Sequence, residues 1–150
     1  MNHHSNTNHS PISPKSIPEY IAMAQRVAQR AYNPYSRFAV GCVLVDRDGE
    51  EHIGCNVESA SYSVTLCAER VAASHAVAMG KRNWQSIYIV SPTRVSPCGV
   101  CRQFLFEFCP DLEVYLGDLT TEETLGPIRL GDLLPFGMTL QQTPLPHDGT

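Results

Sequence analysis

Cys67-Ala68-Glu69-Arg70 opens the stretch CAERVAASHAVAMG, residues 67–80, which combines a helical pattern with reactive side chains. From Cys67 to Met79 nearly every residue is a good helix former, and Gly80 suits the left-handed conformation that ends many helices. The stretch therefore predicts a helix over residues 67–79, and the first turn of that helix carries a cysteine and a carboxylate.

A second cysteine group, Pro97-Cys98-Gly99-Val100-Cys101, opens a helix that we expect over residues 101–108. Free backbone N–H groups and the positive end of the helix dipole stabilise thiolates at a helix start. Cys67, Cys98 and Cys101 then supply three thiolate ligands, one fewer than a structural zinc site needs. The open fourth position indicates a catalytic zinc ion that activates a water molecule, with Glu69 as the proton shuttle.

Two arginines are candidates to support this cluster. Three thiolates on a zinc ion leave a net negative charge, which opposes ionisation of the water molecule. Arg70 and Arg102 each follow directly after a predicted catalytic or ligand residue. We expect both guanidinium groups to donate hydrogen bonds to the cysteine sulfurs and so to offset the charge.

The remaining elements alternate between helix and strand. Ser16 and Glu19 form a capping-box pattern for a helix over residues 18–32, and Asp46-Arg47-Asp48-Gly49 is a hairpin turn. The predicted strands cover residues 37–45, 52–56, 86–90 and 113–116, and a short helical turn covers residues 130–134. This order predicts an α/β domain, a three-layer α/β/α sandwich with a mixed central sheet.

Length and composition favour one zinc-dependent domain over residues 16–142. The chain has 150 residues, of which 43% are hydrophobic, enough for a core that needs no disulfides. Residues 1–15 and 143–150 carry almost no apolar pattern, so we expect a disordered and a flexible tail. Three further cysteines are expected to be ordinary buried thiols, namely Cys42, Cys55 and Cys109.

Charge and hydropathy limit the partners. The formal net charge is −4 and no stretch concentrates lysine and arginine, which argues against a polymeric nucleic acid. No apolar run reaches the roughly 18 residues of a membrane span, and the polar start of the chain lacks an export signal. We therefore expect a cytoplasmic protein with no membrane partner.

Three other interpretations of the cysteines stay open. A structural zinc site would need a fourth ligand, and the sequence has neither a second Cys-x-x-Cys nor a paired histidine. A redox pair at Cys98 and Cys101 would leave Cys67 and Glu69 without a role. Plain buried thiols are the third interpretation. The joint pattern of Cys-Ala-Glu and Cys-x-x-Cys favours a catalytic zinc site of the nucleobase-deaminase kind.

The sequence resembles the small, free-nucleoside cytidine deaminases over roughly residues 31–134. The blocks that agree in order and spacing are Tyr32-Asn33-Pro34-Tyr35-Ser36-Arg37-Phe38-Ala39-Val40-Gly41, Asn56-Val57-Glu58, Ser61-Tyr62, Cys67-Ala68-Glu69-Arg70, Pro97-Cys98-Gly99-Val100-Cys101-Arg102-Gln103 and Leu133-Leu134-Pro135. The resemblance implies the cytidine-deaminase fold, one zinc ion per subunit, and a homotetramer with active sites near the subunit boundaries.

The resemblance also implies roles for residues that would contact a small nucleoside. Phe38 would pack near the pyrimidine, and Asn56 and Glu58 would hold the ribose hydroxyl. The backbone of Ala68, together with Glu69, would read the edge of the base. On physical grounds alone, Phe38 could belong to the core and Glu58 to the solvated surface.

The implied reaction is hydrolysis of cytidine and deoxycytidine to uridine and deoxyuridine, with release of ammonia, in pyrimidine salvage. Glu69 would take a proton from the zinc-activated water, which attacks C4 of the cytosine ring. The same carboxyl group would then return protons to N3 and to the departing ammonia.

Two departures from the family pattern keep other functions open. Ser59 stands where the family commonly has Asn, and Phe136-Gly137 follows Pro135 without the usual spacer. The shortened end resembles blasticidin-type aminonucleoside deaminases, although Phe38 and the block Asn56-Val57-Glu58 fit ordinary cytidine better. A catalytically inactive, zinc-stabilised interaction domain is the non-enzymatic alternative. Relatives that edit nucleic acids typically have His in place of the first cysteine ligand, unlike this chain.

Overall fold

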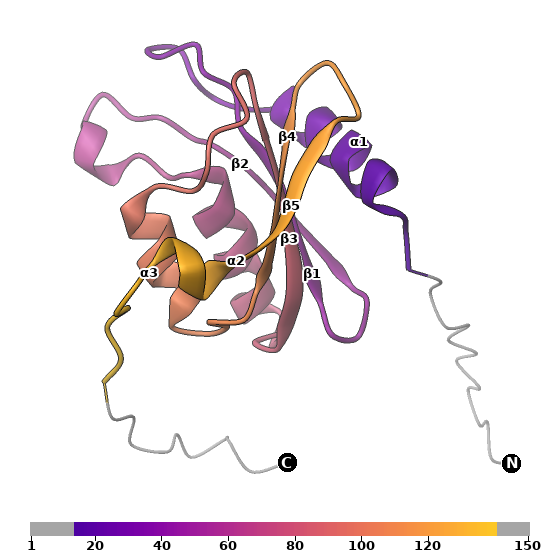
Figure 1. Ribbon diagram of the computed structural model, residues 1–150. Coiled ribbons are helices and arrows are strands. Elements are labelled where there is room, and N and C mark those ends of the chain that lie inside the picture. Colours follow the sequence, from indigo (N-terminus) through magenta and orange to yellow (C-terminus); the bar gives the residue numbers. More distant parts are fainter. Residues whose placement is uncertain (1–13, 141–150) are drawn as a thin grey trace, which may run out of the picture.

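A five-stranded mixed sheet forms the middle layer of the computed structural model, which describes residues 14–140 (Figure 1). The strands are β1 (Gly41–Asp46), β2 (Glu51–Cys55), β3 (Trp84–Ser91), β4 (Glu113–Asp118) and β5 (Thr124–Arg129), and they lie in the order β2-β1-β3-β4-β5. β3 and β4 are parallel, whereas the other neighbouring pairs are antiparallel. The predicted mixed sheet is therefore confirmed.

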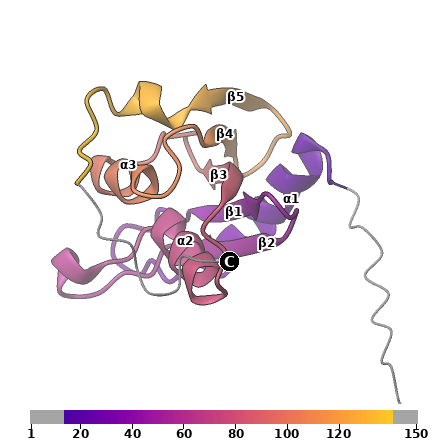
Figure 2. The same cartoon turned by 90° about the horizontal axis from the view of Figure 1, so that it is seen from below.

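Helices cover both faces of this sheet. α1 (Ile17–Ala28) lies on one face, and α2 (Ala68–Ala78) and α3 (Gly99–Phe106) lie on the other (Figure 2). The described residues also form two short 3-10 helices, η1 (Tyr62–Val64) and η2 (Leu130–Leu133). This arrangement confirms the three-layer α/β/α sandwich.

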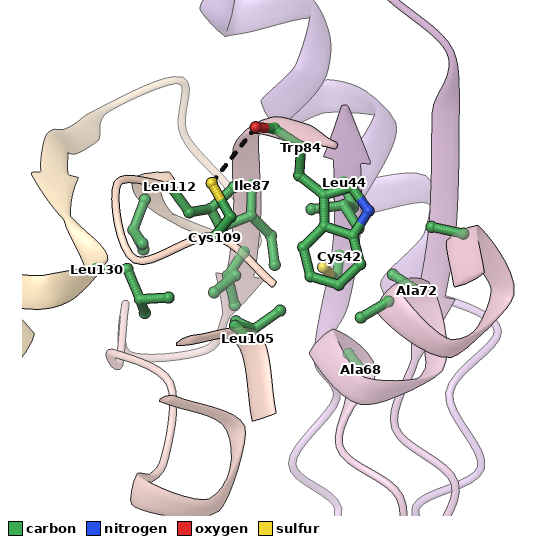
Figure 3. Packing of buried hydrophobic residues seen from close by; sticks show 14 of the residues in the cluster. Cys42, Leu44, Ala68, Ala72, Trp84, Ile87, Leu105, Cys109, Leu112 and Leu130 are labelled. Carbon is green, nitrogen blue, oxygen red and sulfur yellow. Dashed lines mark hydrogen bonds between the residues drawn. The ribbon is translucent and has the colours of Figure 1, made fainter. Parts of the chain in front are cut away.

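Side chains that alternate along the strands divide the core between the two faces. On the α1 face, Val43 of β1 belongs to a buried cluster with Ile21 of α1. On the opposite face, Leu44 belongs to a second cluster with Trp84 and residues of α2 and α3 (Figure 3). There the Cys109 thiol donates a hydrogen bond to the Trp84 carbonyl at 3.4 Å. The second cluster holds the two helices that carry the reactive cysteines.

Two glycines let helices approach the sheet more closely than a side chain would allow. A Cβ atom at Gly41 would overlap the carbonyl oxygen of Ala24 in α1. A Cβ atom at Gly54 would overlap the carbonyl oxygen of Ala68 in α2. Both obstacles are backbone atoms, which cannot move aside by a change of rotamer. Gly54 therefore allows the first turn of α2 to lie directly against β2.

The capping and turn predictions hold. Ser16 and Glu19 form the capping box at the start of α1. Gly49 in the β1–β2 hairpin has φ +84°, and Gly80 after α2 has φ +79°. Both glycines thus adopt the left-handed conformation that other residues rarely take.

The predicted end of the first helix and the predicted start of the first strand are wrong, because the backbone there bonds to other partners. The helix expected over residues 18–32 ends at Ala28, and Tyr32 forms an isolated bridge with Val57. The strand expected from residue 37 begins at Gly41, since the Asn56 side chain bonds the backbone of the preceding residues.

Two elements and one burial assignment also differ from expectation. β5 was not expected, because its Gly126-Pro127 pair is unfavourable in strands. η1 was not expected either. Cys42 and Cys109 are buried as predicted, whereas Cys55 is only partly buried and donates from its thiol to the Arg30 carbonyl at 3.5 Å.

The expected tails lie almost entirely outside the described residues. Residues 1–13 and 141–150 are not described, so, apart from Pro14 and Lys15, the predictions for residues 1–15 and 143–150 concern parts of the chain beyond residues 14–140. Within residues 14–140, none of the helices has the length and apolar character needed to cross a membrane.

Candidate active site

The three predicted zinc ligands come together at the starts of two helices. Cys67 is the N-cap residue of α2, Cys98 is the N-cap residue of α3, and Cys101 lies in the first turn of α3. Their sulfurs all lie within 4.8 Å of one another, and the Sγ atoms of Cys67 and Cys98 are 4.0 Å apart. Tetrahedral zinc with bonds of about 2.3 Å places its sulfur ligands about 3.8 Å apart, so the cluster fits a zinc ion after small shifts.

The pKa values of the cysteine thiols also favour the binding of a cation. Hydrogen bonds from Cys101 and Arg70 lower the pKa of Cys67 to about 5, against the opposing effect of burial. The hydrogen bond to Cys67, together with burial, raises the pKa of Cys101. One thiolate is thus already favoured without a metal ion, and a dication among the sulfurs favours ionisation of the others.

Arg70 contacts the cluster as expected from its position after Glu69. Its guanidinium donates to the Sγ atom of Cys67 at 3.7 Å and to the Thr65 carbonyl oxygen at 3.0 Å. The contact with Cys67 raises the pKa of Arg70, so its guanidinium group stays protonated. Arg70 is therefore placed to offset part of the negative charge that three thiolates would carry around a zinc ion.

Arg102 corrects the second half of that expectation. Its guanidinium donates to the Pro97 carbonyl at 2.7 Å, to the Ser96 hydroxyl at 2.8 Å and to the Leu133 carbonyl at 2.9 Å. Within residues 14–140, no hydrogen bond joins Arg102 to a cysteine sulfur. The reason is helical geometry: successive residues point about 100° apart, so the residue after Cys101 leaves the helix in another direction.

Glu69 lies buried in the first turn of α2, with 5% of its surface exposed. Burial raises the pKa of Glu69 to about 7, although its own backbone N–H and the Cys101 thiol favour the ionised form. A carboxyl group with a pKa near neutrality can both accept and donate a proton at physiological pH. Glu69 thus has the protonation behaviour that general acid–base catalysis requires.

Glu69 and two of the cysteines line one cavity of about 400 Å³. All four residues that the resemblance assigned to substrate contacts line the same cavity, namely Phe38, Asn56, Glu58 and Ala68. Its size suits a small molecule. Residues far apart in the sequence therefore meet around a single site, with the carboxyl group and two sulfurs in its wall.

Asn56 and Glu58 also hold the segment that carries Phe38. The Asn56 side chain donates to the Phe38 carbonyl at 2.8 Å and accepts from the Val40 N–H at 2.8 Å. The Glu58 carboxylate accepts from the Ser36 N–H, with oxygen distances of 3.2 and 3.3 Å. These bonds fix the backbone beside Phe38, a role that the sequence pattern did not reveal.

Sequence reasoning missed three polar residues in the cavity wall, Ser36, Thr65 and Ser96. Ser36 belongs to the block that contains Phe38, and Ser96 directly precedes Pro97-Cys98. Both serines could have been predicted as cavity residues, because they lie next to predicted site residues in the sequence. Thr65 carried no comparable signal, because it lies in the irregular segment between η1 and α2.

A family model described as "Cytidine and deoxycytidylate deaminase zinc-binding region" matches residues 14–117. The cytidine deaminase of Halalkalibacterium halodurans is 43% identical over 124 residues, which cover 81% of this chain and 92% of that protein. The cytidine deaminase of Mycobacterium tuberculosis is 40% identical over 123 residues, which cover 81% of this chain and 88% of that protein.

Solved structures agree with these matches. The crystal structure of cytidine deaminase from Burkholderia pseudomallei has a TM-score of 0.77 and 39% identity, covering 83% of this chain and 100% of that chain. The corresponding structure from Mycobacterium tuberculosis has a TM-score of 0.69 and 37% identity, covering 81% and 96%. The fold of this chain is the cytidine-deaminase fold. The chain belongs to the cytidine and deoxycytidylate deaminase family.

Proposed function

We propose that this chain hydrolyses cytidine and deoxycytidine to uridine and deoxyuridine, with release of ammonia. The observation that carries the proposal is the buried carboxyl group of Glu69 in the wall of the cavity, beside the sulfurs of Cys67 and Cys98. The relatives named cytidine deaminases, such as that of Halalkalibacterium halodurans, support the choice of substrate.

Cys67, Cys98 and Cys101 would hold one zinc ion per subunit. When bound, zinc supplies a Lewis acid that lowers the pKa of a water molecule. Arg70 offsets the negative charge on Cys67 through its hydrogen bond to the sulfur. The donor set has no fourth protein ligand among the described residues, which is the arrangement of a catalytic rather than a structural site.

Glu69 would move the protons of the reaction. Its carboxylate takes one proton from the attacking water and delivers it to N3 of the cytosine ring. It then takes the second proton from the new hydroxyl group on C4 and delivers it to the departing amino group. The elevated pKa of about 7 supports both transfers, because the group gains and loses a proton with little free-energy cost near neutral pH.

The remaining cavity residues would orient the nucleoside. Phe38 would pack against the pyrimidine ring, and Asn56 and Glu58 would bind the ribose hydroxyl. Ala68 is the first residue of α2, so its backbone N–H is one of the helix groups without an intrahelical acceptor and can read the base edge together with Glu69.

Ammonia release by zinc-quantified protein tests the proposal. We expect turnover of cytidine and deoxycytidine, and a loss of at least about 10² to 10⁴ in kcat for Glu69→Gln with zinc retained. Glu122→Gln is the matched control, because it makes the same chemical change at an exposed position in the segment between β4 and β5. Retained turnover in Glu69→Gln would refute the assignment.

Blasticidin S, assayed in parallel, separates the alternatives. Turnover of blasticidin S alone would move the chain to the aminonucleoside branch. Zinc-loaded protein without turnover of any of the three nucleosides would indicate an inactive, zinc-stabilised interaction domain. Turnover of the first two substrates, abolished in Glu69→Gln, supports the nucleoside deaminase.

We also propose a homotetramer. Its support is an apolar surface around a groove of about 620 Å³ between α2 and α3, lined in part by Leu66, Val100 and Phe104. Val100 is 63% exposed and Phe136 is fully exposed, which is unfavourable for a monomer in water. Light scattering should give the mass of four chains, and Val100→Glu should lower that mass by placing a charge in the contact.

A cytoplasmic role in pyrimidine salvage completes the proposal. All six cysteines are free, as a reducing compartment allows. The net charge of −4 does not favour a polymeric nucleic acid as the substrate. Growth of a pyrimidine-requiring strain on cytidine, restored by the wild type and not by Glu69→Gln, is the corresponding test.

A further inference from the structure

Arg102 joins two parts of the chain that are remote in sequence. Its guanidinium donates to Ser96 and Pro97, which directly precede Cys98, and to the carbonyl of Leu133 in η2. η2 lies beside α3 in both ribbon views (Figures 1 and 2). One planar group with donors in several directions therefore spans the loop before Cys98 and the C-terminal part of the domain.

The three acceptors have consequences for the site. Pro97 is buried and Ser96 is half-buried, so their acceptors have little water to replace a lost donor. Ser96 lines the cavity together with Cys98, whose sulfur belongs to the cysteine cluster. A shift of residues 96–98 would therefore move a sulfur and part of the cavity wall together.

Gln103, the next residue of α3, strengthens the same connection. Its side-chain amide donates to the Met138 carbonyl at 2.9 Å and accepts from the Met138 N–H at 3.2 Å. Consecutive residues of α3 thus hold the chain at positions 133 and 138. The segment from Leu133, the last residue of η2, to Met138 is therefore fastened to α3 at both ends, which holds the Leu133 carbonyl in place as an acceptor for Arg102.

We propose that Arg102 is a positioning residue, which acts by tying residues 96–98 to η2 and thereby keeps the Cys98 sulfur at the distance that zinc requires. The inference rests on the proposed zinc site and extends it. Arg102 acts through geometry, since its bonds go to two carbonyls and a hydroxyl, whereas Arg70 acts through charge at a sulfur. The C-terminal part of the domain then contributes to metal retention without supplying a ligand.

The test is the rate at which zinc-loaded protein releases zinc to a coloured chelator. Arg102→Ala should release zinc about 10- to 100-fold faster than the wild type. Arg102→Lys should release zinc nearly as fast as Arg102→Ala, because a single ammonium group keeps the charge but cannot span three acceptors. Ser96→Ala removes one acceptor and should give a smaller increase of about fivefold. The absorption of cobalt-substituted protein should change in the same variants, since it reports sulfur geometry.

Arg129→Ala is the matched control. Arg129 is the residue before η2, but its guanidinium contacts the carboxylates of Asp111 and Asp132 at an exposed position. Its zinc release and cobalt spectrum should equal those of the wild type. Recovery of wild-type release in Arg102→Lys would assign Arg102 a purely electrostatic role and overturn the proposal.

The remaining outcomes distinguish this inference from the proposed function. Wild-type protein that holds no zinc would overturn both. Zinc-loaded wild type with unchanged release in Arg102→Lys and Ser96→Ala would overturn the inference alone, even where Arg102→Ala does not fold. Faster release in both of these variants, with Arg129→Ala unchanged, supports it.

Discussion

Arg70 donates one hydrogen bond to the Sγ atom of Cys67 at 3.7 Å and another to the Thr65 carbonyl at 3.0 Å. The side chain therefore links the cysteine that caps α2 to the segment that leads into the helix. Its charge lies beside three sulfurs that all approach one another within 4.8 Å. This contact is the most direct electrostatic support that the described residues give to the proposed metal site.

Arg70→Ala should lower kcat/KM for cytidine by about 10- to 100-fold. Without the positive charge, ionisation of the attacking water becomes less favourable, so the acidic limb of the pH–rate profile should move to higher pH. Arg70→Lys, which retains the charge, should show the smaller shift. Steady-state rates measured from pH 5 to 9 check this, and a profile identical to that of the wild type in Arg70→Ala would contradict it.

Asn56→Ala should destabilise the fold and weaken substrate binding. The substitution leaves the Phe38 carbonyl and the Val40 N–H without their partner, at a cost of about 1–3 kcal/mol. Because Phe38 then moves, KM should rise more than kcat falls. Asn56→Asp keeps the acceptor for Val40 but cannot donate to Phe38, so its stability and its KM should lie between those of the wild type and those of Asn56→Ala. Thermal unfolding and nucleoside kinetics on the same preparations measure both effects.

Gly54→Ala should cost about 1–3 kcal/mol, because the new methyl group would overlap the backbone of Ala68 and Ala72. α2 would have to move away from β2, and zinc content should fall with it. Gly99→Ala is the control, since a Cβ atom there meets nothing within 4 Å. Denaturant unfolding compares the two, and equal stability of both variants would show that α2 can shift freely.

Asp118 should make stability depend on acid pH. Hydrogen bonds from the Thr120 N–H, from Arg94 and from Thr121 lower the pKa of Asp118 below its usual value of about 3.9. A lowered pKa in the folded state stabilises the protein above the unfolded-state pKa, and this stabilisation is lost as the pH falls through the folded-state pKa. Asp118→Asn should therefore be less stable than the wild type at pH 7.

The difference between Asp118→Asn and the wild type should shrink as the pH falls below about 4. Melting temperatures at intervals from pH 7 to pH 2 give the comparison. Asp132→Asn serves as the control, because its side chain is 70% exposed. A difference between Asp118→Asn and the wild type that stays constant over the whole range would contradict the prediction.

The sequence was sufficient for the features that depend on neighbouring residues. Cys67 and Glu69 were predicted to share the first turn of a helix, and Gly80 was predicted to end it, because propensity and capping act within a few residues. The alternation of helices and strands likewise predicted the layered fold, which the structure confirms. The spacing of Cys98 and Cys101 placed both at the start of one helix.

Tertiary structure alone decided where side chains point and how deeply they are buried. The partners of Arg102 include Leu133, and the partners of Asn56 are backbone groups of Phe38 and Val40, none of which local sequence can predict. The pKa of Glu69 near 7 arises from burial by residues of several elements. Direction and burial result from packing between distant segments, whereas the periodicity of a sequence reports only on the element that contains it.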